Sequence, residues 1–163
     1  MLRVGIITVS DRSARGERPD ASGPALWQRI VAEGWQVTRR AVVPDELSGL
    51  QQILVEWADA GDCDVILTTG GTGFSPRDIT PEATQAVITR AAPGLAEAMR
   101  HASLQVTPHA MLSRAVAGLR ARSILINLPG SPRGALENLE VILPVLPHAV
   151  QLLQEDPQAE AGH

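Results

Sequence analysis

The strongest constraint on this 163-residue chain is an alternation of short apolar runs with longer amphipathic segments. Residues 2–9, 64–69 and 123–128 are rich in β-branched side chains, as buried strands are. Residues 24–34 and 47–57 carry apolar residues at helical spacing. Strands that alternate with helices predict a parallel sheet covered on both faces. We therefore expect one α/β domain, a three-layer α/β/α sandwich with a mostly parallel central sheet.

The rest of the chain continues this pattern. Residues 10–23 are polar and contain glycine and proline, which predicts a long loop, and residues 35–43 predict the second strand. Thr80-Pro81-Glu82 predicts the start of a helix that runs to about Arg90, with Thr80 as its cap. The remaining expected elements are a break at Pro93-Gly94, a helix at 95–101, a strand at 114–118, and a helix after Pro132 that is interrupted near Pro144 and Pro147. We expect the folded domain to span 1–155 and residues 156–163 to form a disordered tail.

All 14 basic side chains are arginine, and 18 acidic side chains give a formal net charge of −4. A Walker A loop and a Schiff base both require lysine, so these two chemistries are excluded. Cys63 is the single cysteine, which excludes an intramolecular disulfide and a CxxC site and suits a reducing compartment.

The composition also limits the partners and the location. The acidic balance argues against a general nucleic-acid binder. The sequence has no signal-peptide pattern and no apolar run of about 18–20 residues, the length that a membrane span needs. We therefore expect a cytoplasmic protein with neither nucleic acid nor membrane as a partner.

A glycine-rich loop directly follows the strand expected at 64–69. Glycines let the backbone approach a ligand closely and direct several N–H groups at an anion, and threonine hydroxyls add donors. The loop residues that we consider for phosphate binding are Thr69, Gly70, Gly71, Thr72 and Gly73. A tight turn leaving the strand explains the same sequence equally well, so both interpretations stay open.

Two aspartates follow expected strands at the same edge of the sheet. Asp78 lies in the loop before Thr80, and we interpret it as an Mg²⁺ ligand rather than the centre of an Asx-turn. Asp45 comes before the helix of Leu47, where a helix N-cap is the simpler interpretation. Two carboxylates beside an anion-binding loop would nevertheless suit metal-assisted phosphoryl or nucleotidyl transfer.

Three further loops carry candidate residues. Ser10 and Asp11 end the first strand, where an ordinary polar turn is the simpler interpretation. Ser113 and Arg114 precede a short strand, and Arg114 could either bind a phosphate or form an ion pair. The segment Asn127–Ser131 offers an amide for a base or ribose and N–H groups at a helix N-terminus for an anion, or it forms only a rigid turn.

The motifs, taken together and in order, resemble the molybdopterin adenylyltransferase family, the MogA/MoaB group that also occurs as the G domain of gephyrin. They are TVSDR, VVPDE, LTTGGTG, PRDITPEAT, LSRAVAG and LINLPGSP, and the resemblance covers about residues 3–154. GGTG alone is generic. TTGGTG followed by RD-x-TPEA and then NLPGSP is specific.

The resemblance implies the α/β/α fold and transfer of AMP from ATP to the terminal phosphate of molybdopterin, with Mg²⁺ as cofactor and pyrophosphate as the second product. It makes Asp45 and Asp78 the catalytic and metal-binding residues. It also implies a homotrimer or a hexamer and delivery of the product to a molybdate insertase. The positions that it assigns to ATP and molybdopterin are Ser10, Asp11, Thr69, Gly70, Gly71, Thr72, Gly73, Ser113, Arg114, Asn127, Pro129, Gly130 and Ser131.

Two alternatives belong to other classes of protein. The first is a non-catalytic molybdopterin-binding or carrier paralogue of the MoaB type, and the second is a general nucleotide-binding interaction module. MoaB-type paralogues without the activity tend to depart from the RD-x-TP and NLPG motifs. This chain keeps both motifs, which favours the enzyme.

Overall fold

Six strands form one sheet in the order β2-β1-β3-β6-β5-β4 in the computed structural model, which describes residues 1–159. Strands β1, β2, β3 and β6 are parallel, whereas β5 and β4 run antiparallel to their neighbours. This confirms the expected mostly parallel sheet. The elements in chain order are β1 (Arg3–Val9), α1 (Asp11–Ala14), α2 (Ser22–Ala32), β2 (Gln36–Val43), α3 (Leu47–Ala60), β3 (Val65–Thr69), α4 (Thr80–Val87), β4 (Arg90–Ala91), α5 (Pro93–Leu104), η1 (Pro108–Leu112), β5 (Ala117–Arg120), β6 (Ser123–Leu128), α6 (Pro132–Ile142), η2 (Leu143–Val145) and α7 (Leu146–Leu153).

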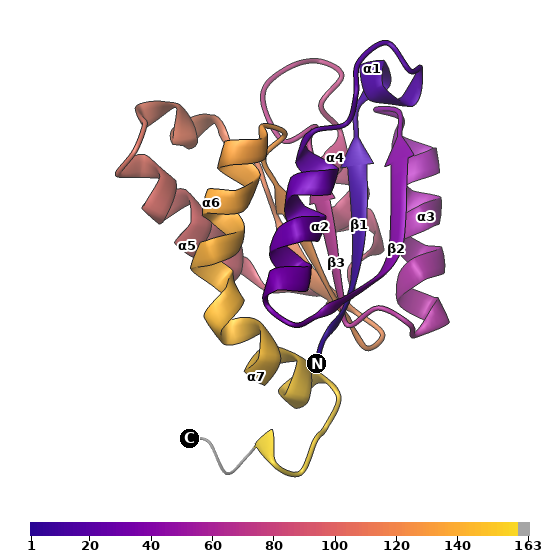
Figure 1. Ribbon diagram of the computed structural model, residues 1–163, viewed down its shortest axis with the longest axis vertical. Helices are drawn as coiled ribbons and strands as arrows, with labels where there is room; N and C mark the ends of the chain where they lie inside the picture. The colour runs from indigo at the N-terminus through magenta and orange to yellow at the C-terminus, as the bar shows by residue number, and fades with distance from the viewer. Residues whose placement is uncertain (160–163) are drawn as a thin grey trace.

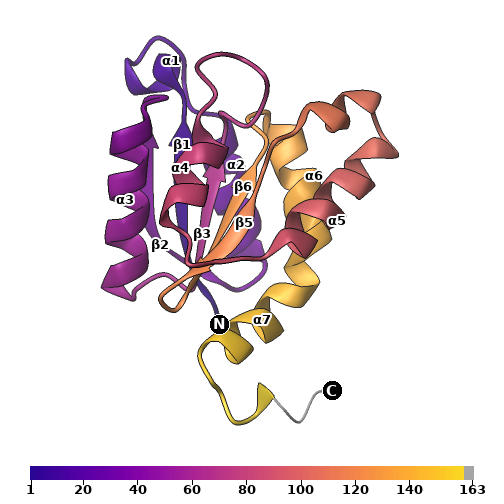
Figure 2. The same cartoon turned by 180° about the vertical axis from the view of Figure 1, so that it is seen from behind.

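Helices cover both faces of the sheet, as expected for three layers. Helices α2 and α6 lie in front of the sheet in Figure 1, and α3 and α4 lie in front of it in Figure 2. Helix α5 packs beside α6, and its Ala96 and Met99 enter the same core as α2 and α6. Because side chains alternate along a strand, β1 serves both layers. Val4 and Ile6 enter the aliphatic core beneath α2 and α6, and Ile7 and Val9 enter the core beneath α3 and α4. Cys63, the buried thiol, belongs to this second core.

The strand order places a crevice beside β1. Helix α2 follows β1 on one face and α3 follows β2 on the other, so the chain changes direction between β1 and β3. Loops after neighbouring parallel strands diverge at such a point, and ligands of open α/β folds bind there. The carboxyl ends of β1, β2, β3 and β6 all face the edge where α1 lies (Figure 1).

Several predicted boundaries were wrong because tertiary partners compete with local preference. The strand expected at 114–118 begins at Ala117, since the Arg114 N–H donates to Thr72 instead of a strand. The helix expected to reach Arg90 ends at Val87, because the Thr89 N–H donates to the Leu119 carbonyl of β5 just before β4 begins at Arg90. Pro93 is the first residue of α5 rather than a break, as its fixed φ suits a helix start.

The loop at 10–23, the interruption at Pro144 and the C-terminal tail each compare differently with the structure. The loop expected at 10–23 contains helix α1 and the first residues of α2. The interruption expected near Pro144 is confirmed as the short 3-10 helix η2. Of the tail expected at 156–163, residues 157–159 form a turn with Ala159 buried. Residues 160–163 lie outside the described part of the chain, so that expectation stays a prediction for them.

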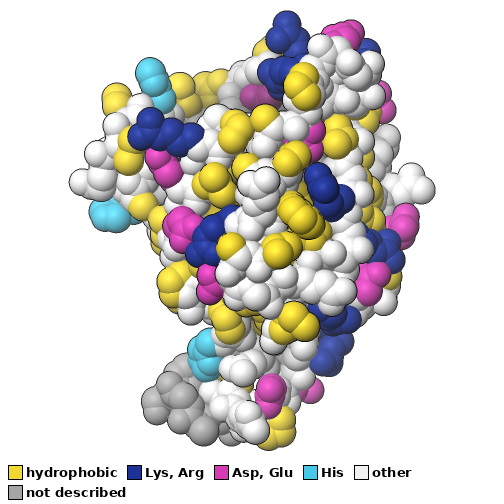
Figure 3. Space-filling view, viewed as in Figure 1, with side chains coloured by type: hydrophobic (Ala, Val, Ile, Leu, Met, Phe, Trp, Pro, Cys, Tyr) yellow, Lys and Arg dark blue, Asp and Glu magenta, His cyan; other side chains and the backbone are white. Residues whose placement is uncertain are grey.

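On the face seen in Figure 3, the described residues form no large patch of a single charge. Arginines and acidic side chains alternate over this face. Within residues 1–159 no helix is both long and apolar enough to cross a membrane.

Asp64 ties together the amino ends of the strands. The residue is 5% exposed, and its carboxylate accepts hydrogen bonds from the Arg3 backbone N–H at 2.8 Å and the Arg3 Nη2 at 2.7 Å. The Gln154 amide, just beyond α7, donates to the same carboxylate at 2.8 Å. Burial alone would raise the pKa of Asp64, but these hydrogen bonds outweigh it and lower the pKa.

We expect Asp64→Asn to reduce the free energy of unfolding at pH 7 by about 1–3 kcal/mol, since hydrogen bonds to a charged group are lost. The folded pKa of Asp64 lies below its ordinary value of 3.8, so this stability is present above that pH and declines as pH falls through the folded pKa. Urea unfolding across this range measures the difference. Glu137→Gln, in an exposed pair with Arg133, is the control and should change stability by less than about 0.5 kcal/mol. Equal stability of Asp64→Asn and wild type at pH 7 would contradict this role.

Candidate functional site

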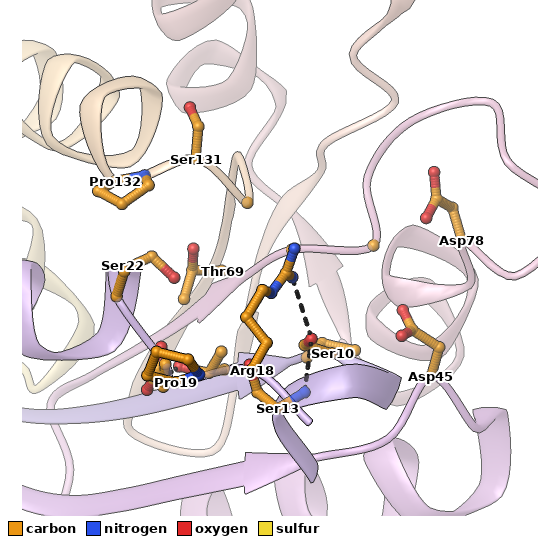
Figure 4. Close-up of a pocket in the computed structure, with 17 residues that line it drawn as sticks. Ser10, Ser13, Arg18, Pro19, Ser22, Asp45, Thr69, Asp78, Ser131 and Pro132 are labelled. Carbon is orange, nitrogen blue, oxygen red and sulfur yellow. Dashed lines mark hydrogen bonds between the residues drawn. The ribbon is translucent and has the colours of Figure 1, made fainter. Parts of the chain in front are cut away.

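A cleft of about 630 Å³ opens at the carboxyl ends of the parallel strands. Loops after β1, β2, β3 and β6 form its walls, and Figure 4 shows side chains from these loops around one hollow. The predicted site residues that line it are Ser10, Asp45, Thr69, Gly70, Gly71, Asp78, Gly130 and Ser131. The structure therefore brings the two aspartates, part of the glycine loop and the segment before α6 into one site.

The glycine loop must pass through a narrow space after β3. Gly70 and Gly71 have φ of 104° and 69°, a region that favours glycine. A Cβ on Gly70 would collide with the carbonyl oxygen of Val9. A Cβ on Gly130 would lie only 3.2 Å from the Cα of Gly70. The loop is thus held against β1 on one side and the segment after β6 on the other.

Thr80 holds this loop from below instead of capping α4. Its hydroxyl donates to the Gly70 carbonyl at 2.9 Å, and its N–H donates to the Gly71 carbonyl at 3.1 Å. The N-cap residue of α4 is Ile79, without a side-chain cap. The predicted cap was wrong because the buried carbonyl of Gly70 takes the hydroxyl.

Asp45 does not cap α3 either. Its carboxylate accepts the Asp11 N–H at 2.9 Å, and the Asp11 carboxylate accepts the Asp45 N–H at 3.0 Å. The residue at the cap of α3 is Glu46, whose side chain makes no cap hydrogen bond. This reciprocal pair fixes the end of β2 to the start of α1, and Asp45 Oδ1 lies 3.1 Å from where a Cβ on Gly71 would stand.

The charges around Asp45 are unbalanced. Burial raises the pKa of Asp45 above its ordinary value, and the nearby charges of Asp11 and Asp78 act in the same direction. Asp11 has a partner of its own, because Arg77 donates two hydrogen bonds of 3.0 Å to it. This hydrogen-bonded ion pair lowers the pKa of Asp11. Asp11 therefore does not line the cleft but links α1 to the loop that carries Asp78.

Asp78 projects from the loop between the glycines and α4. Its Oδ2 accepts the Ser75 N–H at 3.1 Å and lies 2.9 Å from where a Cβ on Gly73 would stand. In Figure 4 the carboxyl groups of Asp45 and Asp78 lie on the same side of the cleft. No group of three or more His, Cys, Asp or Glu residues suited to a metal ion occurs within residues 1–159. A cation here would need oxygens from a ligand as well as these two carboxylates.

Ser10 and Ser131 both cap helices whose first turns face the cleft. Ser10 accepts the Ser13 N–H of α1 at 3.2 Å, and Ser131 accepts the Gly134 N–H of α6 at 3.0 Å. Thr69 is fully buried and donates to the Pro129 carbonyl at 2.6 Å. These bonds fix the cleft wall, and helix N-termini favour anions.

Arg114 serves the loop rather than the cleft. Its guanidinium donates to the carbonyls of Gly73 at 2.7 Å and Asp78 at 2.9 Å, and it forms an ion pair with Glu82 at 2.6 Å. The sequence left phosphate binding and an ion pair open for Arg114, and the structure shows the ion pair with Glu82. With Thr72, whose carbonyl accepts the Arg114 N–H, it braces the loop that holds Asp78.

Asn127 lies beneath the site with its side chain fully used. It is 0% exposed, donates to the hydroxyls of Thr68 and Thr84 at 2.9 Å, and accepts the Val116 N–H at 3.1 Å. The expectation that its amide contacts a base or ribose was wrong for this structure, since no donor is left and the side chain is buried.

A second cavity of about 290 Å³ adjoins the cleft, and Ser131 borders both. Ser113, Gly73 and Pro129 line this second cavity and not the main cleft. The predicted residues thus line two cavities that share Ser131, or belong to the framework beside them.

Sequence reasoning missed five polar residues that line the main cleft: Thr8, Ser13, Arg18, Asp20 and Ser22. Asp20 had a usable signal, since it precedes Gly23 by three residues near a proline, as a capping residue does. Its carboxylate accepts the Gly23 N–H at 3.0 Å. Arg18 had no such signal.

We expect Arg114→Gln to loosen the loop at 72–79, because two carbonyls and the Glu82 carboxylate lose their donor. Amide hydrogen exchange should speed up in this loop, and stability should fall by about 1–3 kcal/mol. Arg133→Gln, which removes an exposed arginine of α6, is the control and should leave the loop unchanged. Unaltered exchange at 72–79 in Arg114→Gln would disprove the bracing role.

Comparison with known proteins agrees with this geometry. Residues 5–148 match the family described as "Probable molybdopterin binding domain". Gephyrin of Dictyostelium discoideum is 42% identical over 96% of the chain, which spans 23% of that protein. Molybdopterin adenylyltransferase of Helicobacter pylori strain J99 is 40% identical over 93% of the chain and 88% of its own length. The Escherichia coli K12 enzyme of the same name is 38% identical over 99% of the chain and 89% of its own length.

Solved structures show the same fold. The molybdopterin biosynthesis enzyme MoaB of Thermus thermophilus superimposes with a TM-score of 0.90 at 51% identity, covering 96% of this chain and 99% of that one. A MogA structure gives a TM-score of 0.87 at 40% identity, covering 93% and 99%. These matches confirm the resemblance drawn from the motifs. The chain belongs to the family of probable molybdopterin binding domains, together with the MogA and MoaB proteins.

Proposed function

We propose that this chain is a molybdopterin adenylyltransferase of molybdenum cofactor biosynthesis, which transfers AMP from ATP to the terminal phosphate of molybdopterin. The observation that carries this proposal is the cleft in which Asp45 and Asp78 face the glycine loop. The relatives that bear this name match nearly the whole chain, which supports the choice of reaction.

The donor set suits Mg²⁺. Asp45 is partly buried beside two other carboxylates, a surrounding that a divalent cation would stabilise. Mg²⁺ prefers one or two carboxylates together with substrate phosphates and water, which matches the two aspartates of this cleft. Asp45 and Asp78 would hold the ion, and it would neutralise charge on the triphosphate and make the α-phosphorus more electrophilic.

The chain's own groups would bind the phosphates around that position. The Gly70 N–H donates to the Leu128 carbonyl at 3.2 Å, whereas the backbone N–H groups of Gly71, Gly130 and Ser131 border the cleft. Such N–H groups hold anionic oxygens without any lysine. Ser10 adds a hydroxyl at the start of α1.

The reaction needs two anions to meet. An oxygen of the terminal phosphate of molybdopterin attacks the α-phosphorus of ATP, and the bond between that phosphorus and the bridging oxygen of the β-phosphate breaks. Pyrophosphate leaves with the bonding electrons, and adenylyl-molybdopterin forms. We assign the pterin end of this substrate to the adjoining cavity lined by Ser113, Gly73 and Pro129. Fixed N–H groups favour such a step because they need no reorientation as charge moves.

Assembly and location are further parts of this proposal. By the resemblance to the family we expect a cytoplasmic homotrimer or hexamer that passes its product to a molybdate insertase. Sedimentation of the purified chain measures the number of subunits.

We expect Asp45→Asn and Asp78→Asn each to lower ATP-dependent AMP transfer by at least about 100-fold, because a metal supplies several kcal/mol of charge stabilisation. The assay incubates the protein with molybdopterin, ATP and Mg²⁺ and separates adenylylated pterin by chromatography. Glu46→Gln is the matched control, since it removes an exposed carboxylate next to Asp45.

The outcomes separate the alternatives. Unchanged transfer in both aspartate variants would disprove the metal site. Tight binding of molybdopterin without turnover by the wild type would instead indicate a carrier, and nucleotide binding without pterin binding would indicate an interaction module.

We expect an excess of EDTA to abolish AMP transfer and added Mg²⁺ to restore it, since the two aspartates would then lack their shared cation. The thermal midpoint should stay the same, because Asp45 and Asp78 are hydrogen-bonded by backbone N–H groups of Asp11 and Ser75. Full transfer in excess EDTA would contradict the metal requirement.

A further inference from the structure

Arg18 reaches into the cleft from the segment between α1 and α2. Its Nη2 donates to the Ser10 hydroxyl at 3.3 Å. In Figure 4 its side chain extends between the wall of Thr69 and Ser131 and the wall that carries Asp45 and Asp78. The guanidinium therefore stands in the space where a ligand of this cleft would lie.

Most of the donors of Arg18 are unused by the protein. Within residues 1–159 its side chain forms one hydrogen bond, to Ser10, and no ion pair. Arg77 is paired with Asp11, and Arg114 is held by Glu82 and two carbonyls. A guanidinium has five N–H donors in a planar fork that matches phosphate oxygens. Of the arginines at this edge, Arg18 is the one whose fork faces the cleft.

The backbone around Arg18 is fixed on both sides. On one side the reciprocal bonds of Asp11 and Asp45 hold the start of α1. On the other side the Asp20 carboxylate accepts the Thr8 hydroxyl at 2.9 Å and the Gly23 N–H at 3.0 Å. A Cβ on Gly23 would collide with this carboxylate, so the contact is close. The segment thus presents Arg18 from a defined position.

The charges that line the cleft are unbalanced in favour of anions. The charged side chains that line the cleft are Arg18, Asp20, Asp45 and Asp78, one cation against three anions. Asp20 is occupied by Thr8 and Gly23, and Asp45 and Asp78 are the proposed metal ligands. A phosphate group in the cleft would find its side-chain cation in Arg18.

We propose that Arg18 is a phosphate-binding residue of this cleft, donating its free N–H groups to phosphate oxygens of a bound substrate. The inference rests on the proposed function for the identity of the substrates. The shared chemistry is a phosphoryl group, which ATP and molybdopterin both carry, and the experiment separates these two sources.

The test compares Arg18→Gln, Arg18→Lys and wild type in calorimetric titrations with ATP plus Mg²⁺ and, separately, with molybdopterin. We expect Arg18→Gln to weaken one of the two ligands roughly 10- to 100-fold, the usual effect of losing a charge-assisted hydrogen bond. Arg18→Lys keeps the positive charge but loses the planar guanidinium, so its affinity should lie between those of Arg18→Gln and the wild type. The ligand that is weakened identifies the phosphate that Arg18 binds.

Arg12→Gln is the matched control. Arg12 lies in α1, just before the segment that carries Arg18, and it is exposed and does not line the cleft; its removal changes the net charge by the same amount. It should bind both ligands as the wild type does. Arg18→Gln should keep the wild-type thermal midpoint, since Arg18 forms a single side-chain hydrogen bond to Ser10.

Wild-type affinity of Arg18→Gln for both ligands would overturn the proposal, and so would an equal loss in Arg12→Gln. Failure of the proposed function is a separate result: the wild type would bind ATP and show no AMP transfer, while Arg18→Gln still weakened ATP. That pattern would uphold Arg18 and reject the reaction.

Discussion

The site depends on the close passage of Gly70 between two strand ends. At this point the chain leaves β3 with a positive φ and packs against the Val9 carbonyl and Gly130. No side chain fits there, so the loop backbone itself becomes the cleft floor. The same tight path brings Gly71 against Asp45, and Gly73 against Asp78. One steric constraint therefore sets the distance between the backbone of the glycine loop and both carboxylates.

An electrostatic difficulty follows from this packing. The cleft concentrates aspartates in a lysine-free chain of net charge −4, yet its proposed substrates are polyanions. In the proposed function, backbone N–H groups, a divalent cation and a local arginine would supply the positive potential. The hydrogen bonds divide the arginines accordingly: Arg77 and Arg114 hold the loops together, and Arg18 faces the hollow. Structural and ligand-binding arginines thus have different partners at one edge of the sheet.

Much of the fold was predictable because buried parallel strands have a strong sequence signature. The β-branched runs gave β1, β3 and β6, and the motifs after them marked the edge where the site lies. Local rules failed where a buried partner competed: Thr80 bonds Gly70, and Asp45 bonds Asp11, although both sit at helix starts. Neither partner is close in sequence, so no local pattern reveals them.

The directions in which side chains point at the site could not be predicted from the sequence either. Asn127 and Arg114 do not line the cleft: the Asn127 amide donates to Thr68 and Thr84 beneath it, and Arg114 donates to carbonyls of the loop that holds Asp78. Arg18 belongs to no recurring pattern, and only the folding of residues 10–23 over β1 brings it into the cleft.

The bond network of Asp64 has a consequence for how such a domain is built into larger proteins. Arg3 and Gln154, near the first and last elements, meet on this one carboxylate at the amino ends of the strands. The cleft lies at the opposite ends. Polypeptide joined beyond either element would begin at the end of the domain opposite the cleft, so neighbouring domains can be attached on both sides without covering the entrance. The gephyrin relative, in which a matching region makes up 23% of the length, has an architecture that such an arrangement permits.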